Sequence, residues 1–210
     1  QIKQSRLAHQ RYLALAASYT APRRGAIVIM RGLSGTGKTT LTQPAVAALG
    51  AVRIRSDLER KRLHGFDPLA STASATGAGI YAADATARTY EQLARHARSI
   101  AGAGYPVIVD ATFLKRGQRA AFHALARELN VPFVIASVAA PPELLRARVA
   151  ARAALGGDAS EATAAVLETQ ITAYEPLSAD ELDYAVTVDA SRDAAASARA
   201  LNDELAQRLR

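Results

Sequence analysis

The chain has 210 residues, of which 50% are hydrophobic and 21% charged, with a formal net charge of +7 and no cysteine. This composition fits one α/β domain that buries a core, and it excludes disulfide bonds and thiolate metal sites. No run approaches the roughly 18 apolar residues of a membrane span, and no signal peptide is visible, so we expect a soluble, cytoplasmic protein without membrane contact. The positive charge either favours anionic ligands, such as nucleotides or nucleic acid, or serves only the solubility of an arginine-rich surface.

Apolar strands and amphipathic helices are predicted to alternate along the chain. A lead-in helix is expected over residues 5–18, and residues 1–24 as a whole are predicted to link to an upstream domain, because the chain begins with Gln1 rather than Met. The predicted strands cover residues 26–30, 52–55, 105–113, 132–138 and 184–190. The predicted helices after the first cover residues 39–49, 57–63, 81–103, 117–129, 141–154, 162–174 and 192–210. This alternation predicts a three-layer α/β fold, with about five parallel strands and functional sites at their carboxyl ends.

In the stretch IVIMRGLSGTGKTTLTQ, residues 27–43, an apolar segment typical of a strand is followed directly by glycines, hydroxyl residues and one lysine. Residues 32–39 fit the phosphate-binding pattern G-x-x-x-x-G-K-[ST], with the strand before it and the helix after it that the pattern requires. The glycines let backbone N–H groups converge on phosphates at the positive end of the helix. Lys38 is expected on the β- and γ-phosphates and the Thr39 hydroxyl on Mg²⁺. The residues expected to bind ATP or GTP are Gly32, Ser34, Gly35, Thr36, Gly37, Lys38, Thr39 and Thr40.

Asp57 follows the second predicted strand and precedes Arg60 by three residues, so both side chains share one helix face. In a phosphotransferase, this carboxylate can take the proton of an acceptor hydroxyl while the arginine orients the acceptor or its phosphate. The alternative is structural: Ser56 or Asp57 caps the helix and Arg60 lies in solvent. We favour the catalytic interpretation because the carboxyl end of a strand faces the expected cleft.

Asp110 ends the apolar run VIVD, where P-loop enzymes often carry an acid that holds Mg²⁺ through water. Thr112 and Arg119 lie just beyond it, and we expect the three residues to position the metal or the acceptor. The alternative for Asp110 is a carboxylate that only caps the next turn.

Three arginines, Arg146, Arg148 and Arg152, lie on the helix that precedes the sequence GGDAS. Arg148 and Arg152 are four residues apart and therefore neighbours on one helix face. They are predicted to form part of a lid near residues 146–162 that neutralises the transferring phosphoryl group. The alternative is an ordinary solvated helix face.

Four stretches together resemble a family of bacterial P-loop kinases: GLSGTGKTT, RSDLERKRL, VIVDATF with Arg119, and GGDASEATAAVLETQITAYEPL. The chain looks like the kinase half of bacterial proteins in which an aminoglycoside-phosphotransferase-like domain precedes a P-loop kinase domain. Wider relatives are similar to polynucleotide 5′-kinases, zeta-toxin-type kinases, gluconate kinases and chloramphenicol phosphotransferase. The resemblance implies phosphate and Mg²⁺ roles for Lys38 and Thr39, a general base at Asp57 beside Arg60, and a lid arginine at Arg148 or Arg152. It also implies one kinase domain over residues 25–210.

We therefore predict a kinase that moves the γ-phosphate of ATP to a hydroxyl acceptor, with residues 64–79 contributing to the acceptor pocket. A small-molecule acceptor is favoured because the tyrosines are too scattered to form a base-stacking platform. The alternative acceptor is the 5′-hydroxyl of a nucleic acid, which the net charge favours. A different alternative is a regulatory module that binds nucleotide and switches a partner domain without phosphate transfer.

Overall fold

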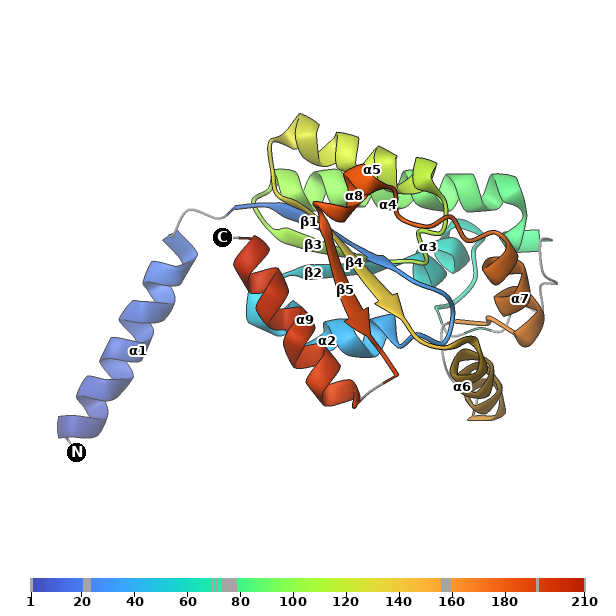
Figure 1. The fold of residues 1–210 in the computed structure, drawn as a ribbon. Coiled ribbons are helices and arrows are strands. Elements are labelled where there is room, and N and C mark those ends of the chain that lie inside the picture. The colour runs from blue at the N-terminus through green and yellow to red at the C-terminus, as the bar shows by residue number, and fades with distance from the viewer. Residues whose placement is uncertain are drawn as a thin grey trace.

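The computed structural model describes residues 2–20, 24–68, 70, 72, 79–155, 160–191 and 193–209. Its centre is one parallel five-stranded sheet with the strand order β2-β3-β1-β4-β5 (Figure 1). The strands are β1 (Ala26–Arg31), β2 (Val52–Arg55), β3 (Pro106–Asp110), β4 (Phe133–Ala139) and β5 (Ala185–Asp189). The helices are α1 (Ile2–Thr20), α2 (Lys38–Leu49), α3 (Ser56–Leu63), α4 (Ala83–Gly102), α5 (Arg116–Leu129), α6 (Pro142–Leu155), α7 (Ala164–Thr172), α8 (Ala179–Leu182) and α9 (Ala194–Arg208), with a 3₁₀ turn at Gly79–Tyr81. The predicted α/β architecture of about five parallel strands is confirmed.

The central strand β1 is buried on both faces, which is why its sequence reads as an uninterrupted apolar run. Val28 and Met30 belong to the cluster that α2 and α9 complete on one face of the sheet. Ile27 and Ile29 belong to the cluster that α4 and α5 complete on the other face. The sheet is thus covered on both sides, and its carboxyl edge is left for the segments that form the site.

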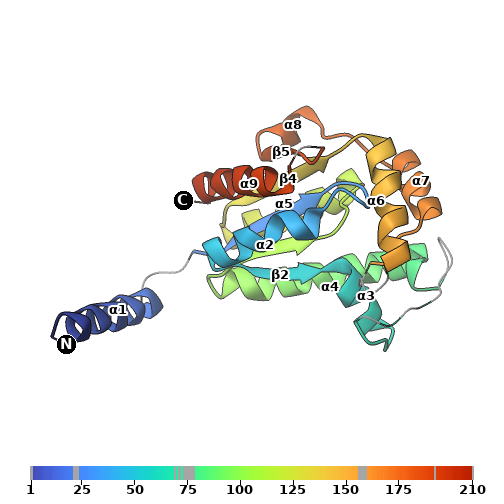
Figure 2. The ribbon, with the colours of Figure 1, turned by 90° about the horizontal axis from the view of Figure 1, so that it is seen from below.

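Helices α6 and α7 lie together beyond the carboxyl ends of the strands (Figure 2). Leu145 and Val149 of α6 pack on Leu167 of α7 in a third buried cluster, which partly covers Leu33 of the glycine-rich loop. Thr163 caps α7 by accepting a hydrogen bond from Val166 N, so this helix begins later than the sequence predicts. Residues 156–159 of the predicted lid lie outside the described residues, as do residues 69, 71 and 73–78, which are half of the predicted loop at residues 64–79.

Besides α7, two further elements differ from the predicted ones. The helix expected to begin at Tyr81 is divided into the 3₁₀ turn and α4. The short helix α8 was not predicted, and it is held by a capping box in which Ser178 and Glu181 exchange hydrogen bonds.

Helix α1 stands apart from the sheet and its covering helices in both views (Figures 1 and 2). Within the described part of the chain, no residue of α1 enters the three buried clusters. Among those same residues, no helix combines the length and apolar character needed to cross a membrane.

Candidate active site

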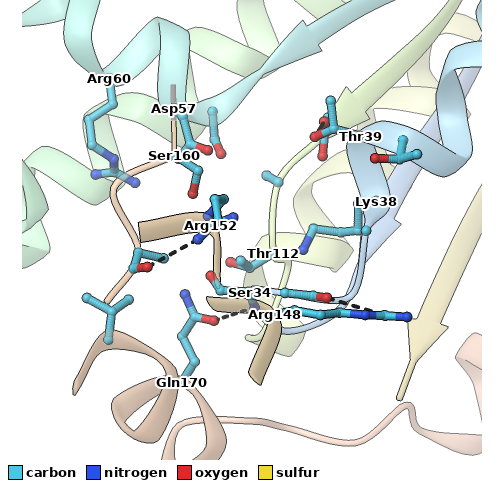
Figure 3. A pocket seen from close by; sticks show the side chains of 18 of the residues that line it. Ser34, Lys38, Thr39, Asp57, Arg60, Thr112, Arg148, Arg152, Ser160 and Gln170 are labelled. Carbon is cyan, nitrogen blue, oxygen red and sulfur yellow. Dashed lines mark hydrogen bonds between the residues drawn. The ribbon is translucent and has the colours of Figure 1, made fainter. Parts of the chain in front are cut away.

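A cavity of about 280 Å³ lies at the carboxyl edge of the sheet, where segments from six parts of the chain converge. Figure 3 shows their side chains directed toward a common space. The glycine-rich loop and the start of α2 contribute Ser34, Gly35, Gly37, Lys38, Thr39 and Thr40. The other lining residues are Ser56, Asp57, Arg60, Tyr81, Tyr90, Asp110, Ala111, Thr112, Arg148, Arg152, Ser160, Ala162, Val166 and Gln170.

The loop after β1 has a shape that only glycine permits at its first position. Gly32 has φ 149°, and a Cβ there would lie 2.4 Å from Val138 O. The Lys38 amino group curls back over the loop and donates to the carbonyls of Gly32 (2.9 Å) and Leu33 (3.0 Å). Burial lowers the pKa of Lys38, while the negative charges of two nearby aspartates oppose that shift. The loop therefore places the Lys38 cation at the cavity, next to the amino end of α2, as a phosphate site requires.

The hydroxyl of Thr39 donates to Oδ2 of Asp110 at 2.6 Å, and Arg55 Nε lies 3.8 Å from the same oxygen. The start of α2 and the end of β3 thus present two neighbouring oxygen ligands of the hard type that Mg²⁺ prefers. The described residues contain no group of three His, Cys, Asp or Glu side chains able to hold a metal alone. The donor set therefore fits a Mg²⁺ ion that takes its remaining ligands from water and phosphate oxygens.

Asp57 lies in the first turn of α3, immediately after β2, and lines the cavity. Burial raises the pKa of Asp57, and the charge of Asp110 raises it further. The positive charges of Arg55, Arg60 and Lys38 oppose this shift and lower the pKa of Asp57. The N-cap residue of α3 is Arg55, which makes no side-chain capping hydrogen bond, and Ser56 and Asp57 lie inside the first turn of the helix.

Arg60 is 7% exposed and lies at the cavity, not in solvent. Its Nη1 donates to Ile80 O at 2.9 Å and to Thr86 Oγ1 at 3.1 Å, and its guanidinium carbon lies 5.0 Å from the centre of the Tyr81 ring. Its buried Nε has no hydrogen-bond partner among the described residues. Burial, with a smaller effect of Asp57, raises the pKa of Tyr81 to about 12, so this hydroxyl stays a hydrogen-bond donor at neutral pH.

Two of the three α6 arginines face the cavity. Arg148 donates to Ala190 O at 2.8 Å and to Gly35 O at 3.5 Å, and Arg152 donates to Ala162 O at 3.1 Å. Arg146 instead pairs with Glu168 at 2.7 Å on the exposed side of α6 and α7. Helix periodicity therefore selects Arg148 and Arg152 for the cavity.

Arg119 requires a correction, because its position contradicts the predicted role at the acceptor. The side chain is 1% exposed, does not line the cavity, and donates to both carboxylate oxygens of Glu181 at 2.6 and 2.8 Å. Its remaining N–H groups donate to backbone carbonyls, including Phe113 O at 3.1 Å. A guanidinium satisfied in this way holds chain segments together. Gly32 and Thr36 also lie outside the lining, and the Thr36 hydroxyl donates within the loop to Leu33 O at 2.9 Å.

The prediction missed Gln170 and the two tyrosines of the cavity, Tyr81 and Tyr90. Gln170 Oε1 accepts a hydrogen bond of 2.8 Å from the backbone N–H of Ser34. Tyr90 Oη accepts from Phe113 N at 3.1 Å and holds a turn in which Phe113 has a positive φ of 45°. Tyr81 and Tyr90 belong to no motif, and the 3₁₀ turn and α4 bring them to the cavity. Gln170 lies in one of the four stretches that carry the family resemblance, but that resemblance gives it no role.

The sequence pattern of one protein family, described as the AAA domain, matches residues 27–177. An uncharacterized protein of Mycobacterium tuberculosis is 28% identical over 157 residues, which are 75% of this chain and 32% of that protein. An uncharacterized protein of Mycobacterium bovis matches with the same figures. The chain thus spans about a third of the length of the curated relatives it matches.

Three solved structures share the fold. A gluconokinase from Sinorhizobium meliloti has a TM-score of 0.61 at 22% identity, over 89% of this chain and 95% of that one. Kti12 of Chaetomium thermophilum, in complex with ADP-AlF3, has a TM-score of 0.66 at 16% identity, over 88% and 99%. The APS kinase CysC of Mycobacterium tuberculosis, in complex with AMPPNP and APS, has a TM-score of 0.61 at 20% identity, over 88% and 99%. At these identities the likeness concerns the fold, which is that of P-loop kinases.

Proposed function

Because the chain belongs to the AAA domain family and has a P-loop kinase fold, we propose that it transfers the γ-phosphoryl group of ATP to a hydroxyl group of a small molecule. Kinases among the structural neighbours support a nucleotide-dependent function of kinase type. The observation that carries the proposal is the placement of Asp57 in the same cavity as Lys38 and Thr39. A carboxylate with a raised pKa that faces a phosphate-binding loop suits proton removal from an acceptor hydroxyl.

In the proposed reaction, the acceptor oxygen bonds to the γ-phosphorus as the bond to the β-phosphate oxygen breaks, and ADP leaves. The hydroxyl proton passes to the carboxylate of Asp57. Lys38 and the loop amides neutralise the phosphates, and Arg152 and Arg148 add positive charge from the α6 side. Arg60 orients the acceptor. Thr39 and Asp110 would hold Mg²⁺, which when bound supplies further neutralisation of phosphate charge.

The size of the cavity supports a small acceptor. A volume of about 280 Å³, near the lower limit of ordinary small-ligand pockets, with lining from both the phosphate loop and Asp57, suits a compact acceptor. The +7 net charge favours a nucleic acid instead. The 5′-hydroxyl of a polynucleotide is therefore the second acceptor to test.

The test is transfer of labelled γ-phosphate from ATP across two panels, hydroxylated metabolites and 5′-hydroxyl oligonucleotides. We expect label in a small-molecule product. Labelled oligonucleotide ends would overturn the small-molecule acceptor. Absence of transfer to both panels, together with nucleotide-dependent binding of a partner domain, would support the regulatory module instead.

Asp57→Asn tests the base directly. We expect the rate of transfer to fall by about 100- to 10,000-fold, because the acceptor proton loses its carrier, while ADP affinity measured by calorimetry is retained. The matched control is Asp84→Asn, which removes a 73% exposed carboxylate on α4 and should leave the rate unchanged. An unchanged rate in Asp57→Asn would exclude Asp57 as the base.

The same variant should be more stable than the wild type. The folded-state pKa of Asp57 is raised, so its ionised form costs stability above that pKa and the cost vanishes below the unfolded pKa of 3.8. We expect Asp57→Asn to raise the free energy of unfolding in urea at pH 8 by about 0.5–2 kcal/mol, and the gain to disappear as pH falls toward 3.8. A loss of stability at pH 8 would show that the three neighbouring cations outweigh burial.

A further inference from the structure

The contact between Gln170 and the phosphate-binding loop fixes how the side-chain amide is oriented. A backbone N–H can only donate, so the atom 2.8 Å from Ser34 N must be the carbonyl oxygen of Gln170. The NH₂ group therefore lies on the other side of the amide. Figure 3 shows it directed away from the loop and into the cavity, toward the α6 side on which Arg152 lies.

The region that this NH₂ group faces is where the end of a bound triphosphate belongs. The lysine of such loops reaches the β- and γ-phosphates. Here the Lys38 amino group lies on the carbonyls of Gly32 and Leu33, the two residues directly before Ser34. Arg152 lines the same cavity as Lys38 and supplies a second cation there. A terminal phosphate held by these groups lies beside Ser34 and hence beside Gln170.

Contacts before and after Gln170 restrain the part of the chain that carries it. Leu167, one turn earlier in α7, is completely buried against Leu145 and Val149 of α6. After α7, the carbonyl of Glu175 accepts a 2.8 Å hydrogen bond from the buried Arg31. The side-chain oxygen of Gln170 is thus held by Ser34 N–H. The helix that carries Gln170 is held by the packing of Leu167 before it and by the hydrogen bond from Arg31 to Glu175 after it.

We propose that Gln170 donates its amide N–H to the terminal phosphate of the bound triphosphate, and so lets the site distinguish a nucleoside triphosphate from a diphosphate. This inference rests on the proposed function and adds a phosphate contact from α7 that neither the loop motif nor the α6 arginines supply. The diphosphate ends before this position and gains nothing from the amide.

The test is the affinity for ADP and for the non-hydrolysable triphosphate AMPPNP, each with Mg²⁺, measured by calorimetry. Gln170→Met keeps the side-chain length and loses both polar groups. We expect it to weaken AMPPNP binding about 10-fold and ADP binding less than about 3-fold, because a hydrogen bond to a charged group is lost only with the triphosphate. Gln170→Glu keeps an acceptor for Ser34 N–H and replaces the donor by a negative charge. It should weaken AMPPNP binding about 100-fold, with a much smaller effect on ADP.

The matched control is Thr169→Glu, which adds the same charge at the neighbouring, exposed position of α7 and should leave the ratio of the two affinities unchanged. Thermal unfolding of each variant verifies that the fold is retained. Equal weakening of ADP and AMPPNP in both Gln170 variants, or no weakening, would overturn the proposed donor role and leave Gln170 as a tie between α7 and the loop.

Failure of the proposed function gives a different result. A wild-type protein that binds neither nucleotide would overturn the nucleotide site and this inference together. A protein that discriminates AMPPNP from ADP through Gln170 but transfers no phosphate would contradict only the kinase activity.

Discussion

Two buried arginines, Arg31 and Arg119, hold the chain that follows α7 against the body of the domain. Arg31 donates to Ser137 Oγ at 3.0 Å and to Glu175 O at 2.8 Å. Arg119 donates to Pro176 O at 3.2 Å and forms a bidentate pair with Glu181. A planar guanidinium can satisfy several acceptors at once, which explains arginine at both positions.

Removal of Glu181 should destabilise the fold in a pH-dependent way. Burial alone raises the pKa of Glu181, but hydrogen bonds from Arg119 and Ser178 outweigh it and lower the pKa to about 2. The stabilisation is therefore complete above the unfolded pKa of 4.5 and is lost as pH falls from there through about 2. We expect Glu181→Gln to reduce the free energy of unfolding by about 3 kcal/mol at pH 7 and by progressively less below pH 4.5.

Urea unfolding at pH 7 and at acid pH measures this difference. The control is Glu128→Gln, whose pair with Arg98 lies in solvent and should not contribute measurably. A loss of stability that is the same at pH 7 and pH 3 would contradict an ionic contribution of Glu181.

At the residue scale, the sequence identifies candidate site residues that belong to a motif or follow a strand, but it does not show which charged residues are buried in ion pairs. Asp57, Asp110 and Lys38 follow strand ends or a loop motif, and the structure brings all three to one cavity. Arg119 could not be placed in this way, because its partner Glu181 lies 62 residues further along the chain. An arginine near a predicted site looks the same in sequence whether it binds a ligand or a buried glutamate.

At the scale of elements, the connection from β1 to α2 is closely packed against the neighbouring strands. Gly32 directly follows β1, and its backbone passes close to the carbonyl oxygen of Val138 in the neighbouring strand β4. The Gly32 N–H donates to the backbone carbonyl of Thr112 at 3.0 Å, so the segment that follows β3 also fixes the loop. The loop is thereby built from the ends of three adjacent strands.

Gly32→Ala is expected to displace the loop and weaken ADP binding by about 10- to 100-fold, because the new Cβ would lie 2.4 Å from Val138 O. Calorimetry with ADP measures the effect. Gly50→Ala is the control: it has a positive φ of 58° but no atom within 4 Å of its Cβ, so only a conformational cost of roughly 1 kcal/mol in stability is expected. Comparable losses of ADP affinity in both variants would show that contact with β4 does not shape the loop.

The strands and the loop were predictable because their signals are local: apolar runs buried on both faces, and glycines between a strand and a helix. The position of α7 could not be predicted, because Gln170 contacts Ser34, which lies 136 residues earlier in the chain. This contact depends on the packing of Leu167 against α6. In the sequence, Leu167 is an ordinary apolar helix residue, and nothing there identifies its packing partner.

At the scale of the whole molecule, residues from β1 onward contain every member of the three buried clusters in the described part of the chain. Helix α1 instead exposes four large apolar side chains, Leu7, Tyr12, Leu13 and Leu15, by 50–73%. We propose that residues 1–24 connect the domain to another part of a longer protein, in line with the share of its relatives that the chain covers.

A chain that begins at residue 24 should fold and keep its stability. We expect its free energy of unfolding in urea to differ from that of the full chain by less than about 1 kcal/mol, because none of the described residues of α1 belongs to the three buried clusters. ADP affinity should be unchanged. A substantially larger loss would mean that α1 packs on the domain and belongs to it.

The anchors at the two ends of the α6 and α7 pair have a mechanical consequence. The pair leaves β4 at Pro141 and returns at Glu175, where Leu114 O accepts the Glu175 N–H and Arg31 holds the Glu175 carbonyl. Between these two points the pair is also tied to the body of the domain, because Arg148 donates to Ala190 O at 2.8 Å and Gln170 accepts from Ser34 N at 2.8 Å. Helices α6 and α7 are packed together through Leu145, Val149 and Leu167. Arg152 and Gln170 are thus presented to the cavity by one clamped unit, not by two independent helices.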